Sequence, residues 1–235
     1  VISFHALGWL AGIAAAGITN DLKLIFLISA AAFIIGLLFT IKLPNPVQEK
    51  ELKPGTTRQI ISKNKFLFLS LLLRHIGAAA VWVILPIMIM EKWGGDLYHI
   101  SVVYVANTLT AFILMNVMAS KIHLSNITKF KIGIGATTFV FVGLAFVTDW
   151  WMAMPFMSLV GATWAFLFIG GNFHLMENNP RSTSTGIFSS TLSIATVIGP
   201  VIGGTIAFLF DYVAVLYFAV VIIVCAFIVS LKIKK

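Results

Sequence analysis

Arg74 and His75 are the two residues whose chemistry contrasts most with their surroundings. Both lie in an apolar segment that spans about residues 66–90, and Arg74 comes eight residues after Phe66. At the rise of an α-helix this separation is about 12 Å. An arginine near the centre of a membrane helix costs about 2.5–3.5 kcal/mol on insertion scales, so it is a functional candidate by default.

The guanidinium of Arg74 has several possible roles. Its planar fork of donors can pair with an acidic residue or hold an anionic substrate. Alternatively, the long side chain can extend to the membrane surface and keep its charge in water. No acidic residue lies at a comparable depth, because Glu177 falls at the end of its own segment. The adjacent His75 points about 100° away around a helix, and it can exchange protons or serve as a packing residue.

Further polar and aromatic residues lie in the inner parts of the apolar segments. Together with Arg74 and His75, we expect five of them to line a substrate cavity: Trp82, Asn107, Asn172, Ser193 and Thr196. Trp164 also falls in the middle of its segment and is, like Trp82, a candidate for the cavity. The alternative is that these side chains form hydrogen bonds between helices or fill the space between them. Trp9, Trp93 and the Trp150–Trp151 pair are expected at the membrane interface.

The composition identifies the environment of these residues. Of the 235 residues, 60% are hydrophobic and 10% are charged, and the mean hydropathy is +1.02. A soluble domain carries about 25% charged residues, and an apolar stretch of about 20 residues is long enough to cross a bilayer. The sequence therefore predicts an all-α polytopic membrane protein. Its single cysteine, Cys225, excludes an intrachain disulfide and a cysteine-based metal cluster.

Charged residues and prolines divide the chain into eight apolar segments. They span about residues 1–18, 24–42, 66–90, 98–120, 130–148, 150–176, 185–210 and 212–231. The polar, proline-containing stretch between the second and third segments predicts a long central loop. The chain begins inside an apolar segment, so we expect a fragment whose N-terminal part is missing.

The basic residues give the expected orientation. Under strict alternation, one set of segment ends holds Lys42, Lys50, Lys53, Arg58, Lys63, Lys65, Lys121, Lys129, Lys131, Arg181, Lys232, Lys234 and Lys235, and the opposite set holds only Lys23 and Lys92. Cytoplasmic loops are enriched in lysine and arginine, so we predict a cytoplasmic C-terminus. The basic excess can also bind anionic lipid, and no nucleic-acid partner is needed to explain it.

Two glycine-rich stretches are similar to each other. The sequence GWLAGIAAAG contains Gly8, Gly12 and Gly17, and IGPVIGG contains Gly199, Pro200, Gly203 and Gly204. When Gly12 is aligned with Gly199, Gly17 falls on Gly204, and an aspartate precedes the next segment in both cases. Small residues at such spacing allow membrane helices to approach closely. Repeated halves of this kind are typical of transporters.

The pattern G-x3-G-P-x2-G-G resembles the fifth-helix motif of the major facilitator superfamily, which is prominent in its drug–proton antiporters. The first copy has Ile13 in place of proline and Ala16 in place of glycine, and the family's Gly…Asp-Arg…Gly-Arg signature is absent from the loop after residue 120. The resemblance implies a bundle with eight of twelve transmembrane helices. Residues 1–43 would be helices five and six, residues 44–65 the cytoplasmic central loop, and residues 66–235 helices seven to twelve.

The resemblance implies a secondary transporter of the plasma membrane that moves a small solute by alternating access. Glycine-rich helices five and eleven would meet at surfaces that open and close. Proton-coupled efflux of drug-like compounds is one expectation, with protons as the coupling ion. The alternatives are an organic-anion or metabolite transporter with Arg74 as the anion clamp, and a receptor or scaffold on the same fold. We expect a monomer in the lipid bilayer, without a cofactor or metal.

Other classes of membrane protein lack their characteristic residues. The sequence contains no HExxH or GxSxG motif and no pair of acidic residues inside an apolar segment, so an intramembrane enzyme is not expected. Nothing resembles the filter loop or the ring of charges of a channel.

Overall fold

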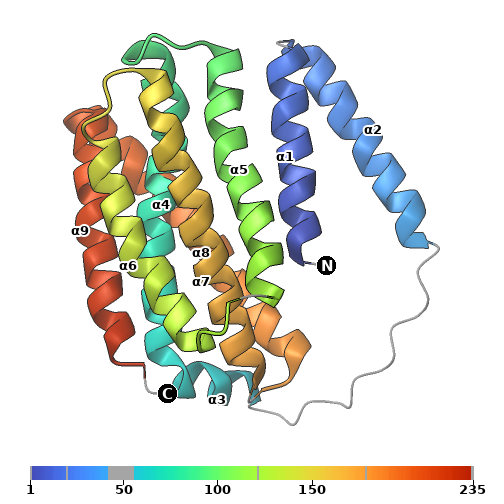
Figure 1. Cartoon of the computed structure of the whole chain (residues 1–235), viewed down its shortest axis with the longest axis vertical. Coiled ribbons are helices and arrows are strands. Elements are labelled where there is room, and N and C mark those ends of the chain that lie inside the picture. Colours follow the sequence, from blue (N-terminus) through green and yellow to red (C-terminus); the bar gives the residue numbers. More distant parts are fainter. Residues whose placement is uncertain (1, 20, 42–55, 121, 178, 234–235) are drawn as a thin grey trace.

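A computed structural model of the chain describes residues 2–19, 21–41, 56–120, 122–177 and 179–233. Within these ranges the structure is entirely helical, apart from short turns and connections (Figure 1). The helices are α1 (Ile2–Thr19), α2 (Leu22–Ile41), α3 (Thr56–Lys63), α4 (Lys65–Glu91), α5 (Leu97–Ser120), α6 (Asn126–Leu144), α7 (Ala153–Glu177), α8 (Arg181–Leu209) and α9 (Tyr212–Leu231), with a 3₁₀ turn, η1 (Trp150–Met152), before α7.

Seven helices in the described part of the chain are long and apolar enough to cross a membrane. They are α2 and α4 to α9, with η1 extending α7. The first helix adds a shorter apolar stretch, Leu7–Thr19. The prediction of an all-helical chain with many apolar helices is thus confirmed. Large apolar side chains cover the outside of the bundle, and Phe33 and Phe208 are 81% and 88% exposed, as expected of surfaces that face lipid.

Helices α4 and α7 each pack closely against two other long helices. Helix α4 packs against α8 and α9, while α7 packs against α5 and α6. The helix α1 lies along α5, and α2 leans away from the other helices (Figure 1). All side chains of α2 that the structure describes are exposed except Ile25, which is partly buried. The core therefore lies within α4 to α9, which are the helices expected to form the C-terminal domain.

Contacts between helix ends show that α4 and α9 run in opposite directions. At one end, the ammonium of Lys232 lies 5.9 Å from the ring centre of Phe66, so the end of α9 meets the start of α4. At the other end, the hydroxyl of Tyr212 donates to the Glu91 carboxylate over 2.9 Å. The start of α9 therefore meets the end of α4, as alternation requires.

The described basic residues follow this alternation. Arg58, Lys63, Lys65, Lys129, Lys131, Arg181 and Lys232 lie at the starts of α4, α6 and α8, in α3 and after the end of α9. The predicted cytoplasmic residues Lys42, Lys50, Lys53, Lys121, Lys234 and Lys235 lie outside the described residues, as does most of the central loop. Which end faces the cytoplasm stays a prediction.

Three parts of the chain differ from the segments predicted above. Helix α8 begins at Arg181, four residues before the predicted start at residue 185. Helix α3 occupies the second half of the predicted central loop, where Ile60 is buried and the charged side chains on either side of it are exposed. Helix α6 begins and ends four residues earlier than expected. It starts at Asn126 because the Ser125 side chain accepts a hydrogen bond from the backbone N–H of Thr128, which is a helix N-cap.

The aspartates that follow the two glycine-rich stretches have the same local role. Asp21 accepts the backbone N–H of Lys23 over 2.8 Å at the start of α2. Asp211 accepts the backbone N–H of Ala214 over 2.7 Å at the start of α9. A carboxylate at a helix N-terminus satisfies free N–H groups and interacts favourably with the helix dipole. The similarity between the two regions therefore extends to how the following helices begin.

The glycines of the two stretches differ in what they contact. Gly199 and Gly203 face α4, where an added Cβ atom would lie 2.6 Å from the Ala79 Cβ atom and from the Ala80 carbonyl oxygen, respectively. Gly17 faces the Ser101 side chain of α5. In contrast, an added Cβ at Gly8, Gly12 or Gly204 meets nothing within 4 Å. Close approach of helices therefore depends on Gly17, Gly199 and Gly203.

Replacing Gly17 with valine should loosen α1 from α5, because the new Cβ atom overlaps the Ser101 side chain. We expect faster amide hydrogen exchange along α1, while α7 keeps its protection. Gly12→Val on the same helix is the control, since its Cβ atom has open space. A second change, Ser101→Gly, should restore slow exchange in the Gly17→Val variant. Equal exchange in the two single variants would contradict the close contact.

Candidate functional site

A cavity of about 400 Å³ lies between α1, α5, α7 and α8. A volume of this size is at the lower end of the range for small-molecule sites. Its walls combine aromatic and aliphatic side chains with a few neutral polar groups. The lining residues are Trp9, Asn107, Thr108, Ala111, Met115, Trp164, Phe168, Ser189, Leu192 and Ser193.

The four helices place these residues by simple helical spacing. Asn107, Ala111 and Met115 recur every four residues on α5, and Trp164 and Phe168 do so on α7. Residues four apart lie on one face of a helix. Most of the lining residues belong to the middle part of their helix, so the cavity lies well away from both ends of the bundle. Helices α5 and α7 pack closely beside the cavity, because an added Cβ atom at Gly161 of α7 would overlap the backbone oxygen of Asn107 of α5. This contact fixes the position of one cavity wall relative to the other.

Two of the predicted cavity residues, Asn107 and Ser193, line this space. The Ser193 hydroxyl donates to the Ser189 carbonyl one turn earlier over 3.1 Å. Thr196 on the same helix is exposed and donates to the Leu192 carbonyl over 2.9 Å. It is not among the residues that line the cavity. The polar stripe of α8 therefore bonds to its own backbone, and part of it faces the cavity.

Arg74 lies behind the cavity wall, in the space between α4, α6 and α7. Its side chain is only 1% exposed. One terminal nitrogen donates to the Thr137 hydroxyl over 3.3 Å. The guanidinium carbon lies 5.6 Å from the ring centre of Trp164, a distance at which a cation is attracted to an aromatic face. The Arg74 side chain thus ends inside the bundle and does not reach its surface.

His75 and Asn172 are also inside the bundle. The His75 ring lies 5.5 Å from the Trp164 ring, with a 30° angle between their planes. The Asn172 amide donates to the Phe168 carbonyl over 3.1 Å. Among the described residues, His75 Nδ1 and Asn172 Oδ1 have no hydrogen-bond partner. Trp164 therefore lines the cavity and also contacts both members of the Arg74–His75 pair.

Trp82 lies elsewhere in the bundle, between α4, α5 and α6. Its ring is 6.0 Å from that of Tyr104 and 6.3 Å from that of Phe141. The Tyr104 hydroxyl donates to the backbone carbonyl of Trp82 over 3.3 Å. Trp82 therefore packs in an aromatic cluster, and it is not among the residues that line the cavity.

Several lining residues were not on the list predicted from the sequence. Trp9 was expected at the membrane interface, yet it lines the cavity and remains 52% exposed. Thr108 and Met115 belong to the Asn107 side of α5, and Phe168 follows Trp164 by one turn. The four-residue spacing of the aromatic residues Trp164 and Phe168 was the sequence signal that could have identified the α7 wall of the cavity.

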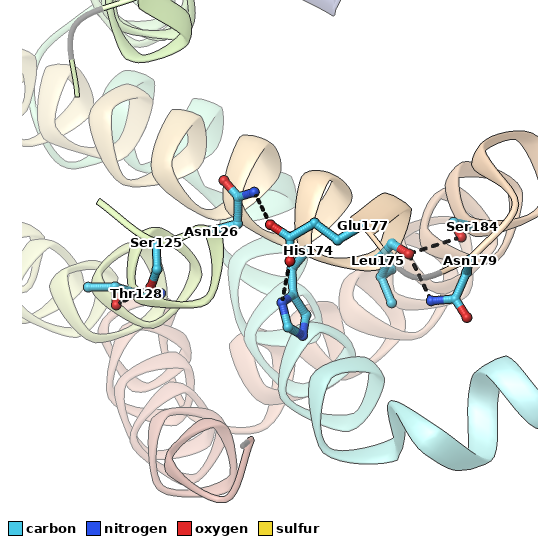
Figure 2. Close-up of polar contacts among 8 residues, drawn as sticks. All are labelled: Ser125, Asn126, Thr128, His174, Leu175, Glu177, Asn179 and Ser184. Carbon is cyan, nitrogen blue, oxygen red and sulfur yellow. Dashed lines mark hydrogen bonds and ion pairs between the residues drawn. The ribbon is translucent and has the colours of Figure 1, made fainter. Parts of the chain in front are cut away.

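A polar cluster joins the ends of α6, α7 and α8 (Figure 2). The Asn126 amide donates to one carboxylate oxygen of Glu177 over 2.6 Å, and His174 Nδ1 lies 3.6 Å from the other. Asn179 and Ser184 both donate to the Leu175 carbonyl. These bonds satisfy the Leu175 carbonyl and the Glu177 carboxylate at the end of α7, so the cluster fixes how these helix ends meet.

At the opposite end of the bundle, Asp96 caps α5. Its carboxylate accepts the backbone N–H of His99 over 3.0 Å. This hydrogen bond lowers the pKa of Asp96 below its ordinary value, because it favours the charged form. The cap is therefore fully formed at neutral pH and weakens only as the pH falls through the lowered pKa.

No protein-family model and no curated protein sequence matches this chain. The resemblance to the major facilitator superfamily rests on the glycine-rich stretches and on the alternation of apolar segments. What this chain shows directly is an all-helical bundle with many apolar helices, a partly open cavity between four of them, and a buried arginine behind one wall of that cavity.

Proposed function

We propose that the chain belongs to a secondary transporter that moves a small solute across a membrane by alternating access. The observation that carries this proposal is the cavity between α1, α5, α7 and α8. It combines apolar walls with a few polar groups, as small-molecule sites do. Its depth within a set of apolar helices matches the midplane site expected of such transporters.

The proposal includes the fold and domains of the major facilitator superfamily. Helices α1 and α2 would be the fifth and sixth of twelve, and α4 to α9 the seventh to twelfth. In support, α1, which would belong to the N-terminal domain, packs mainly against α5 of the C-terminal domain. Its residue Trp9 is one of those that line the cavity. A solute bound there would touch both proposed domains. Movement of one domain relative to the other would then change access to it.

The location of the charged residues favours the organic-anion alternative over efflux of drug cations. None of the eight acidic residues lies in the inner part of an apolar segment, so these helices offer no carboxylate to a cationic solute or to a coupling proton. Arg74, in contrast, is a charged residue in the inner part of its apolar segment. An intramembrane charge of this kind marks a substrate or ion pathway.

The test is transport by the full-length gene product in proteoliposomes, with and without an imposed pH gradient. Lipophilic cations, neutral amphipaths and organic anions form the solute panel. We expect protein-dependent and saturable movement of at least one class. Binding of a solute without movement of any class would instead favour a receptor on this fold.

Asn107→Leu should reduce the transport rate at least about tenfold, because the change fills part of the cavity and removes one of its polar groups. Asn116→Leu on the same helix is the matched control, since Asn116 is exposed and outside the residues that line the cavity. Transport that is equally fast in both variants would place the solute elsewhere.

A further inference from the structure

The buried charge of Arg74 is poorly compensated by the protein. Its Nε atom has no hydrogen-bond partner among the described residues. Its one hydrogen-bond partner among the described residues, the Thr137 hydroxyl, also donates to the Gly133 carbonyl over 2.6 Å. A neutral hydroxyl at 3.3 Å contributes much less than a carboxylate would. A charge in this position is costly unless it is paired and hydrogen-bonded.

The described acidic residues are all too far along their helices to pair with Arg74. Asp21, Glu91, Asp96, Asp149 and Asp211 lie at one set of helix ends, and Glu177 lies at the other, where it binds Asn126. No ion pair of Arg74 with a carboxylate occurs in the described part of the chain. The guanidinium therefore has donors available for a negative group that the helices themselves do not provide.

One aromatic side chain contacts both this charge and the cavity. Trp164 lines the cavity, and its ring also lies 5.6 Å from the Arg74 guanidinium and 5.5 Å from the His75 ring. It is partly buried, whereas Arg74 is almost completely buried. A movement of this indole is the simplest way for a solute in the cavity to reach the donors of Arg74.

We infer that Arg74 is the anion subsite of the cavity, that Trp164 is the movable side chain between them, and that the solute is a flat aromatic monoanion such as an aryl carboxylate. This inference rests on the proposed function and names its substrate class. The guanidinium fork matches the two oxygens of a carboxylate. Trp9, Trp164 and Phe168 supply aromatic surface for a flat ring. Among the described residues, no charged side chain lines the cavity itself, so the single positive charge of Arg74 matches a solute with one negative charge.

Three probes of the same shape test the inference: 2-naphthoate, 2-naphthamide and 2-naphthylmethylammonium. Their binding to the purified chain in lipid nanodiscs is measured by equilibrium dialysis. We expect naphthoate to bind the unaltered protein at least about tenfold more tightly than naphthamide, because charge-assisted hydrogen bonds exceed neutral ones. The ammonium should bind most weakly. Equal binding of naphthoate and naphthamide would overturn the inference without any variant.

Arg74→Met should reduce naphthoate binding to the level of naphthamide and leave naphthamide binding unchanged. Lys129→Met is the matched control, because it removes another buried cation, 7% exposed, near the start of α6. That variant should keep the preference for naphthoate. If the preference for naphthoate survives in Arg74→Met, or disappears equally in Lys129→Met, it comes from the general positive charge of the protein. Either result would overturn the inference.

Trp164→Ala should join the two spaces permanently. We expect weaker binding of naphthamide, because an aromatic wall is lost, and an unchanged or larger preference for naphthoate. Loss of the preference would show that Trp164 does not separate the anion from Arg74. Binding and transport are scored separately. Saturable transport without a preference for anions would support the proposed function and overturn this inference. Arg74-dependent binding of anions without any transport would support this inference and contradict the proposed function.

Discussion

The Arg74→Met variant is expected to be more stable than the unaltered protein and inactive in transport of anions. Arg74 is 1% exposed and makes one hydrogen bond with a neutral hydroxyl. Replacing buried charges with apolar side chains of similar volume is often stabilising by about 1–4 kcal/mol. For a chain of this size, each kcal/mol corresponds to a rise of roughly 2–4 °C in the unfolding temperature. Thermal unfolding in detergent measures the first effect.

Loss of transport together with a gain in stability is the pattern of a residue kept for function. The same variant should move aryl carboxylates at least about a hundredfold more slowly in proteoliposomes, since their charge would lose its partner inside the membrane. Arg74→Lys keeps the charge without the planar fork and should be intermediate. A lower unfolding temperature for Arg74→Met would instead assign the guanidinium a structural role through Thr137 and Trp164.

The helices could largely be predicted because the membrane imposes a strong pattern on the sequence. Apolar segments must be long, and charged residues are confined to their ends. Helix α9 therefore spans the same residues as its predicted segment, Tyr212 to Leu231. Short-range features decided two of the exceptions. The Ser125 cap starts α6 earlier than its apolar residues suggest, and α3 depends on one buried side chain, Ile60, which is too weak a pattern to recognise in a polar segment.

The cavity was predictable only in part, because it depends on how each helix is rotated about its axis. Asn107 and Ser193 are small polar residues in otherwise apolar segments, and this contrast identified them. Trp82 is eight residues from Arg74, which places the two side chains about 80° apart around α4. One faces α6 and α7 and the other packs against Tyr104. Which face meets which neighbour is set by tertiary packing, and no spacing within α4 reveals it.

Gly203→Leu should have the largest effect on folding of any change in the glycine-rich stretches. Helices α4 and α8 meet so closely that an added Cβ atom would lie 2.6 Å from the Ala80 carbonyl oxygen and 2.8 Å from its Cα atom. These are backbone atoms, which cannot rotate away. Overpacking of a filled interface costs about 1–3 kcal/mol and occasionally more, so we expect a clearly lower unfolding temperature and a low yield of folded protein.

Gly204→Leu on the same helix is the control, because its Cβ atom meets nothing within 4 Å. Leucine favours the membrane interior and forms helices well, so this variant should fold at least as stably as the unaltered protein. Since α8 carries Ser189 and Ser193 and α4 carries Arg74, a partly folded Gly203→Leu protein should also bind 2-naphthoate more weakly. Equal stability of the two variants would mean that α8 does not depend on Gly203 to approach α4, and that the glycines of IGPVIGG serve movement of the helix instead of its packing.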